Sequence, residues 1–116
     1  MTVRELMDQG IFETVTEGDF PDTEITKCFC CDLLSVAMGK APDGACWVTV
    51  VSNMNTLAVA SLRDSACVIL SENVEPNDLV IRKAEQEGIA VLKSPLPSFD
   101  TALRVWQLLE DEKNAS

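Results

Sequence analysis

Short apolar runs alternate with amphipathic stretches along the second half of the chain. Residues 46–51 (CWVTVV), 66–70 (ACVIL) and 89–92 (IAVL) are almost wholly apolar and rich in β-branched side chains. Such runs are typical of parallel strands that are covered on both faces. Between them, residues 55–64 and 77–88 have helical composition and begin near asparagines that can cap a helix. The alternation predicts an α/β fold with a mostly parallel sheet flanked by helices.

The first half of the chain is less regular. Thr2 followed by Glu5 predicts a capping box that opens a short helix, and Gly10 ends it. Residues 11–16 alternate between apolar and polar, as in a half-buried strand, and residues 24–29 predict another strand. With the three apolar runs, these segments predict a sheet of about five strands in one compact domain over residues 1–116.

Two more helices complete the prediction. Asp32 is expected to cap a helix over residues 33–40, which the following Pro-Asp-Gly turn ends. A final helix is expected from about Ser98 or Phe99, followed by a polar tail at residues 110–116 that frays. One apolar stripe is predicted on that helix, formed by Ala102, Val105, Trp106 and Leu109.

Net charge narrows the partners that we expect. The chain carries a formal charge of −10, and no Lys or Arg occurs between Arg4 and Lys27. A phosphate backbone or an anionic bilayer would be repelled, so we expect no nucleic acid and no membrane as partners. No apolar run approaches the roughly 20 residues that a membrane helix needs. Five cysteines, an odd number without a disulfide pattern, predict a cytoplasmic protein.

Three cysteines, Cys28, Cys30 and Cys31, fall within four positions. In a strand, Cys28 and Cys30 share a face with their Cα atoms about 6.5–7 Å apart, at the limit for a disulfide. Cys46 and Cys67 are expected ~10–15 Å away, at the other end of a parallel sheet. Because the chain has no His, a metal site would need a fourth ligand from these thiols or a carboxylate. Buried structural thiols and a redox or metal site both stay open.

Polar residues follow three of the predicted strands. Ligands of open α/β sheets bind beyond the carboxyl ends of the strands. A helix start with nearby hydroxyls and amides can hold a small polar or anionic ligand, although the asparagines could serve only as helix caps. The candidate ligand-binding residues are Asp32, Ser35, Thr49, Ser52, Asn53, Asn55, Ser71 and Glu72.

No catalytic motif occurs in the chain. It contains no phosphate-binding P-loop, no dinucleotide-binding glycine motif and no nucleophile elbow. Without His, acid–base chemistry would fall to carboxylates or lysines, and the acids lie mostly in turns and on exposed helix positions. We therefore expect a protein that is not an enzyme and that carries no cofactor.

Several segments over residues 28–110 together resemble the DRTGG domain family. They are CDLLSVAM, WVTVVSNMNTLAVASL, ACVILSENVEP and KAEQEGIAVLKSPLPSFDTA, in the order and spacing of that family. The opening TVRELMDQGIFETVTEG also fits. The tract that names the family is not kept: DTEITKC stands in its place, and Cys31 replaces the glycine of the family's G-D-L-L-S turn.

The resemblance implies a fold like that of the N-terminal domain of HPr kinase/phosphorylase. Related domains occur in the regulatory part of some phosphotransacetylases and beside CBS domains. With the polar positions at the strand ends and the missing catalytic motifs, it points to a non-catalytic regulatory module that binds a small polar or nucleotide-like ligand or a partner protein. We also expect a homo-oligomer, specifically a dimer. The alternative is a cysteine-based redox or metal-linked accessory protein with a signalling or hydrogenase-related partner, using Cys28, Cys30 and Cys31.

Overall fold

Five strands form one sheet in the computed structural model, which describes residues 1–115. Strands β2 to β5 are parallel and lie in chain order, and β1 is antiparallel to β5 at the other edge. This arrangement confirms the predicted mostly parallel sheet. The strands, in the spatial order β1-β5-β4-β3-β2, are β1 (Glu13–Thr16), β5 (Ala90–Lys93), β4 (Cys67–Leu70), β3 (Ala45–Thr49) and β2 (Lys27–Cys30).

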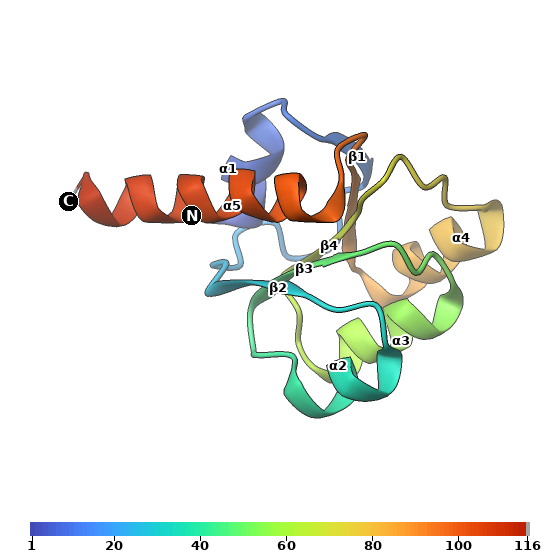
Figure 1. The fold of residues 1–116 in the computed structure, drawn as a ribbon. Coiled ribbons are helices and arrows are strands. Elements are labelled where there is room, and N and C mark those ends of the chain that lie inside the picture. Colours follow the sequence, from blue (N-terminus) through green and yellow to red (C-terminus); the bar gives the residue numbers. More distant parts are fainter. Residues whose placement is uncertain (116) are drawn as a thin grey trace.

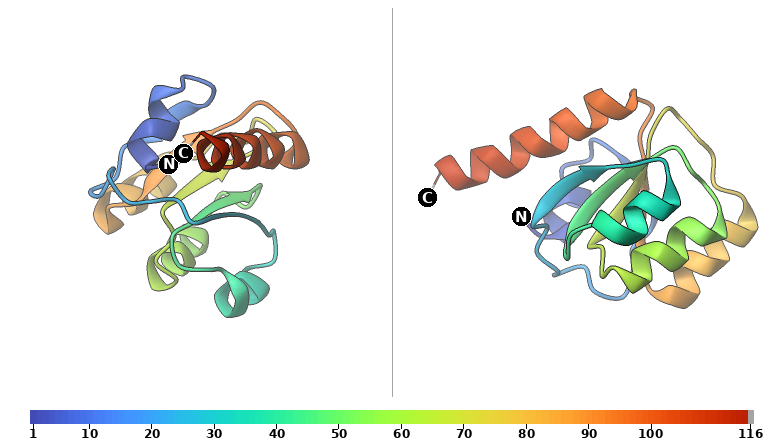
Figure 2. Two further views of the ribbon diagram at one scale, coloured as in Figure 1. Left: turned by 90° about the vertical axis from the view of Figure 1, so that its left-hand side faces the viewer. Right: turned by 60° about the horizontal axis from the view of Figure 1, so that its bottom comes forward.

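Helices cover both faces of the sheet (Figures 1 and 2). The three helices that connect parallel strands, α2, α3 and α4, share one face, and the two helices near the chain ends, α1 and α5, share the other. The chain changes face after β5, because α5 runs back over β2 and β3. Their bounds are α1 (Val3–Asp8), α2 (Leu34–Lys40), α3 (Met54–Leu62), α4 (Asp78–Glu87) and α5 (Ser98–Asn114).

Each face of the sheet has its own apolar core. Strand side chains alternate between the faces, so Cys46 and Val48 join the core under α1 and α5, whereas Trp47 lies in the core above α2, α3 and α4. All five residues of β3 are buried. Burial on both faces explains why the central strands are nearly continuous apolar runs in the sequence.

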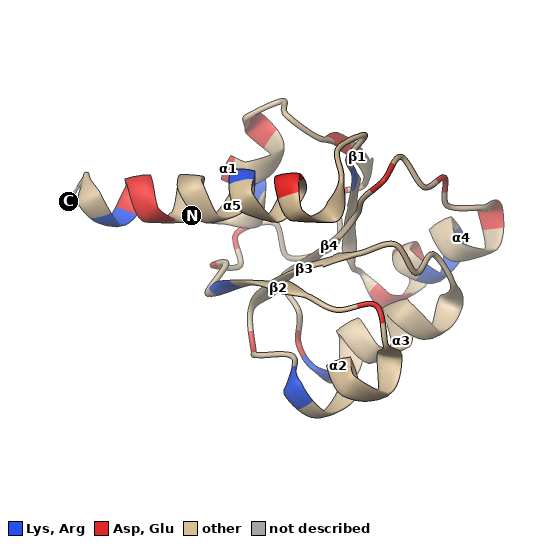
Figure 3. Ribbon diagram, viewed as in Figure 1, with Lys and Arg blue, Asp and Glu red and all other residues tan. Residues whose placement is uncertain are grey.

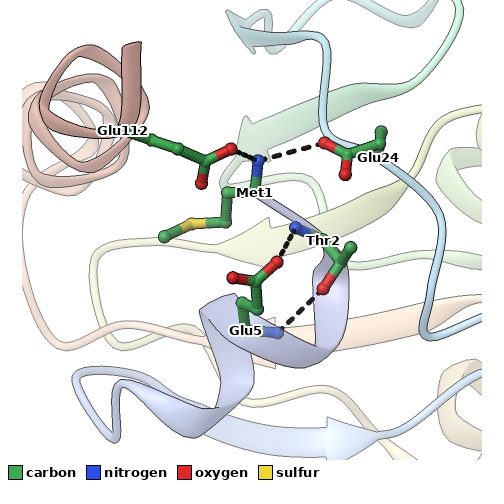
Figure 4. A network of polar contacts seen from close by, with 5 residues as sticks. All are labelled: Met1, Thr2, Glu5, Glu24 and Glu112. Atoms are coloured by element: carbon green, nitrogen blue, oxygen red, sulfur yellow. Dashed lines mark hydrogen bonds and ion pairs between the residues drawn. The ribbon is translucent and has the colours of Figure 1, made fainter. Parts of the chain in front are cut away.

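Most predicted helix ends are confirmed. Thr2 and Glu5 form the reciprocal capping box of α1 (Figure 4). Asn53 and Asn77 cap α3 and α4 through their side chains, and Gly88 ends α4 with a φ of 67°. These caps need only neighbouring residues, which is why the sequence pattern predicts them.

The chain start is held against α5. The amino group of Met1 contacts the carboxylates of Glu24 and Glu112, which come from the segment before β2 and from the last turns of α5 (Figure 4). The predicted fraying of residues 110–116 is wrong for most of this tail, because α5 continues to Asn114. Ser116 lies outside the described residues.

Asp32 does not cap α2, contrary to the prediction. The N-cap position is Leu33, whose side chain makes no capping hydrogen bond. Asp32 Oδ1 instead accepts hydrogen bonds from Thr49 Oγ1 and from Val50 N, each at 2.9 Å. The carboxylate reaches across to the neighbouring strand because β2 and β3 end side by side.

The apolar stripe of α5 was predicted partly wrongly. Val105 is fully buried, but the side chain of Trp106 is 54% exposed. Helix α5 lies over β2, which is the edge strand of the sheet. Among residues 1–115, no further strand lies under the outer side of the helix, so part of its apolar surface stays uncovered.

The predicted separation of the cysteines was also wrong. Strand β2 begins at Lys27 and not at Glu24, which forms only an isolated bridge with Thr2. Cys28 is therefore the second residue of its strand and pairs in register with Cys46, which pairs with Cys67. The three thiols form a row across neighbouring strands on the face under α5.

Candidate functional site

A row of polar groups crosses the carboxyl ends of the parallel strands. Asp32 follows β2 and accepts the hydroxyl proton of Thr49, the last residue of β3. The carbonyl oxygen of Thr49 accepts from Ser71 N at 3.1 Å, and Ser71 follows β4. Ser71 Oγ lies 2.6 Å from Ser98 Oγ, at the first turn of α5. The row therefore connects four elements that are distant in sequence.

Thr49 is the buried centre of this row. Its side chain is fully buried, and its hydroxyl donates to Asp32 and accepts from Val51 N at 3.1 Å. The single donor of the hydroxyl and one of its two acceptor sites are therefore used inside the protein. Thr49 fixes the end of β3 and the turn into α3, and its hydroxyl proton is not available to a ligand without loss of the bond to Asp32.

The turn between β3 and α3 carries an unpaired hydroxyl. Asn53 Oδ1 accepts from Asn55 N at 2.7 Å and from Thr56 N at 3.3 Å, which caps α3. Within residues 1–115, Ser52 Oγ is a buried oxygen that no hydrogen bond reaches, and Ser65 Oγ is another. A buried hydroxyl without a partner costs free energy. The turn between β3 and α3 therefore contains a polar atom whose hydrogen-bonding capacity is unused.

The segment after β4 has an unusual backbone. Glu72 and Asn73 both have a φ of 58°, a left-handed conformation that non-glycine residues seldom adopt. Their N–H groups donate to Leu96 O and to Ser94 O, and Glu72 Oε2 accepts from Ser98 N at 2.9 Å. Glu72 therefore caps α5 from another part of the chain, since Pro97 at the N-cap offers no side-chain acceptor.

The structure brings part of the predicted site together. Asp32, Thr49 and Ser71 are joined by hydrogen bonds, and Ser52 and Asn53 lie in the turn directly after β3. Glu72 lies at the same edge of the sheet, but its carboxylate caps the start of α5. Ser35 and Asn55 lie away from this row, Ser35 exposed on α2 and Asn55 exposed on α3.

Sequence reasoning missed the polar residues after β5. Ser94 Oγ and Thr101 Oγ1 lie 2.7 Å apart and are fully buried, and Ser98 contacts Ser71. The signal was present as hydroxyl residues in the turn after residues 89–92, the last of the three apolar runs. The sequence prediction used only the junctions after the three earlier parallel strands.

Two cavities lie away from this row. One of about 250 Å³ includes Gly18, Phe20 and Ser65, near the amino ends of the strands. Another of about 440 Å³ lies between the edge strand β2 and α5, where Cys28 and Trp106 contribute to its wall. Neither includes a predicted ligand-binding residue, so such a ligand would rest on the polar edge and not in a deep hollow.

The alternative metal site at Cys28, Cys30 and Cys31 is not assembled. Cys28 packs with the core under α5, whereas Cys31 packs with the core on the opposite face. Cys31 Sγ donates to Leu33 O at 3.3 Å. In the part of the chain that the structure describes, no three potential ligands among Cys, Asp and Glu are grouped to hold an ion.

The fold is similar to that of a solved protein structure. It is the crystal structure of the CBS and DRTGG domains of the regulatory region of Clostridium perfringens pyrophosphatase, complexed with its activator, diadenosine tetraphosphate. The TM-score is 0.67 at 18% sequence identity, over 89% of this chain and 44% of that chain. The fold is DRTGG-like.

At 18% sequence identity, the comparison establishes similarity of fold only. This chain spans less than half of the compared chain. No family model matches the sequence, and no curated protein matches it. Among the described residues, no helix has the length and apolar character needed to cross a bilayer.

Proposed function

We propose that this protein is a regulatory module without catalytic chemistry of its own, and that it binds a small polar ligand at the β3–α3 turn. The observation that carries the proposal is Ser52 Oγ, a buried hydroxyl with no hydrogen-bond partner. It lies between the fixed Thr49–Asp32 pair and the capped start of α3. Because this oxygen is buried, a ligand has to displace part of the turn to reach it; by supplying the partner it would then recover a lost hydrogen bond and gain affinity.

Local charge selects the ligand class. Asp32, Glu72 and Glu75 belong to the loops at this edge, and Asp78 begins α4 there. Glu75 is paired with Lys93, whereas Figure 3 shows the acidic segments between β2 and α2 and before α4. A free polyphosphate would meet these carboxylates and be repelled. The ligand that fits best is therefore a neutral polar group such as a nucleoside, or a nucleotide whose phosphates carry Mg²⁺.

The structural likeness supports a regulatory role. The compared pyrophosphatase region is described as regulatory and is complexed with a nucleotide activator, although it contains CBS domains as well as a DRTGG domain. We extend to this chain only the idea of a regulatory, ligand-responsive fold. The ligand itself has to be identified by experiment.

A thermal-shift experiment tests the proposal. The probes are adenosine, ATP with Mg²⁺, diadenosine tetraphosphate with Mg²⁺, and inorganic phosphate, each titrated against the full chain. A bound ligand at 100 times its Kd stabilises the folded state by about 2.7 kcal/mol, which raises the melting temperature by several degrees. We expect such a rise with adenosine or a Mg²⁺-nucleotide and none with phosphate. If no probe raises the melting temperature, the proposed ligand class is wrong.

Ser52→Ala separates ligand binding from stability. The variant removes an unpaired buried hydroxyl, so the free protein should be at least as stable as the wild type, while the ligand-induced rise should be lost. Ser65→Ala is the matched control, because its hydroxyl is also buried and unpaired but lies beside the cavity near Gly18. A rise that persists in Ser52→Ala would place the ligand elsewhere.

We also propose that the protein forms a dimer through α5. Phe99, Leu103 and Trp106 recur at helical spacing, and their side chains are 72%, 38% and 54% exposed. Such a stripe is typical of a helix that packs against a partner. Asp100 and Arg104 on the same helix could pair with their counterparts across an antiparallel contact.

We also propose a cytoplasmic location, which the five free cysteines support, because free thiols are typical of a reducing compartment.

A further inference from the structure

Cys28 and Cys30 bring two thiols together on the edge strand. Both belong to β2 and lie two positions apart, so their side chains point to the same face of the sheet. Cys28 is half-buried and contributes to the wall of the cavity of about 440 Å³ beside α5, and Cys30 is exposed. A small reagent can therefore reach both sulfur atoms.

The two thiols differ in acidity. Hydrogen bonds from the thiols of Cys30 and Cys46 lower the pKa of Cys28, although burial opposes this change. Donation to Cys28 and burial raise the pKa of Cys30. Cys28 also lines the cavity beside α5 that a small reagent can enter. This placement, together with the lowered pKa, makes Cys28 the attacking thiol, because the thiolate is the reactive form. Cys30 stays protonated beside it and can react in a second step.

The other three cysteines are placed differently. Cys46 and Cys67 are fully buried in the central strands, and the Cys46 pKa is raised by its hydrogen bond to Cys28 and by burial. Cys31 packs on the opposite face of the sheet and donates to Leu33 O. These three have either no access to solvent or no path to Cys28.

We propose that Cys28 and Cys30 form a thiol–disulfide exchange site that reacts with small-molecule disulfides. The Cys28 thiolate attacks one sulfur of the disulfide, so a protein–reagent S–S bond forms and one reagent thiolate leaves and takes up a proton. The Cys30 thiol then gives up its proton to solvent, and its sulfur attacks Cys28. The second reagent thiol leaves, the protein has lost two hydrogens, and the disulfide has gained them.

The position of β2 at the sheet edge makes the second step feasible. Two residues apart in a strand, the Cα atoms are about 6.5–7 Å from each other, near the upper limit of about 6.8 Å for a disulfide. The Cβ atoms must also approach to about 4 Å, so the bridge requires a local bend of the strand. β2 pairs only with β3, so it can bend outward more easily than a central strand, which is held on both sides.

Mass spectrometry of the full chain tests the proposal. The reduced protein is mixed with 2-hydroxyethyl disulfide and then digested with trypsin, which cuts after Lys27 and Lys40 and isolates residues 28–40. This peptide contains Cys28, Cys30 and Cys31 but neither buried cysteine. We expect it to lose two hydrogens and to carry no hydroxyethyl group. Persistent labelling of Cys30 alone, with no internal bridge, would overturn the proposal.

Single substitutions assign the two roles. Cys30→Ser should leave a stable mixed disulfide on Cys28, and Cys28→Ser should slow the first step by at least about tenfold. Cys31→Ser is the matched control and should behave as the wild type, because that thiol faces the other core. If Cys31→Ser or Cys46→Ser abolishes the bridge and Cys30→Ser does not, the resolving thiol is assigned wrongly and the proposal fails. Cys28→Ala repeats the test if Cys28→Ser does not fold, as judged by its melting curve.

Discussion

At the scale of single residues, Asp32 shows how a side chain can serve an element other than its own. The sequence places it before a helix, where an aspartate is a good cap. In the structure its Oδ1 accepts from Thr49 and Val50 on the next strand. Two hydrogen bonds to an ionised acceptor, one of them from a buried hydroxyl, are worth more than one cap bond at an exposed helix start.

Asp32→Ala should therefore destabilise the protein by about 1–3 kcal/mol, because the buried Thr49 hydroxyl loses its acceptor. Asp32→Asn keeps an acceptor oxygen in the same place and should cost clearly less. Urea denaturation of both variants measures the difference. Equal losses in the two variants would mean that the charge of Asp32, and not its hydrogen bonding, stabilises the fold.

At the scale of elements, α5 depends on a distant residue for its start. Pro97 at its N-cap has no side-chain acceptor, and the carboxylate of Glu72 accepts from Ser98 N instead. The left-handed backbone at Glu72 and Asn73 turns the segment after β4 toward α5. The same segment donates to Leu96 O and Ser94 O, so it ties the last two parallel strands to the helix on the other face.

Glu72→Ala should lower the free energy of unfolding by about 1 kcal/mol, the usual effect of losing a helix cap. Asn73→Gly is the control, since it changes the same left-handed segment without touching the cap. It should stay within about 0.5 kcal/mol of the wild type, because relief of the left-handed strain and the extra freedom of glycine in the unfolded chain oppose each other. Chemical denaturation compares them. A larger loss for Asn73→Gly than for Glu72→Ala would contradict the capping role.

At the scale of the whole molecule, α5 projects beyond the sheet in Figures 1 and 2. Its buried side, which includes Val105, covers the sheet, and its exposed stripe of Phe99, Leu103 and Trp106 lies next to that side. The helix therefore has more apolar surface than a sheet ending at β2 can cover. This excess is the physical reason for the proposed dimer.

Leu103→Glu should convert the dimer into a monomer, because a carboxylate would be buried without a partner at the centre of the stripe. Leu62→Glu is the control, since Leu62 is an exposed leucine of α3 and should leave the dimer intact. Size-exclusion chromatography with light scattering gives the mass of each form. A wild-type protein that elutes with the mass of one chain would disprove self-association.

The sequence by itself determined the parts of this protein that depend on neighbouring residues. The apolar runs of β3, β4 and β5, the capping box at Thr2 and the caps at Asn53 and Asn77 are all local patterns, and the structure confirms them. Strand alternation with helices also predicted the fold class, because parallel strands need covered faces and crossover helices.

Only the tertiary structure decided which distant residues meet. The row of Cys28, Cys46 and Cys67 depends on strand register, and a start of β2 three residues later than predicted moved Cys28 beside Cys46. Likewise, the contacts of Asp32 with Thr49 and of Glu72 with Ser98 join different elements. Register and cross-element hydrogen bonds come from the packing of the whole sheet, and no local pattern of residues encodes them.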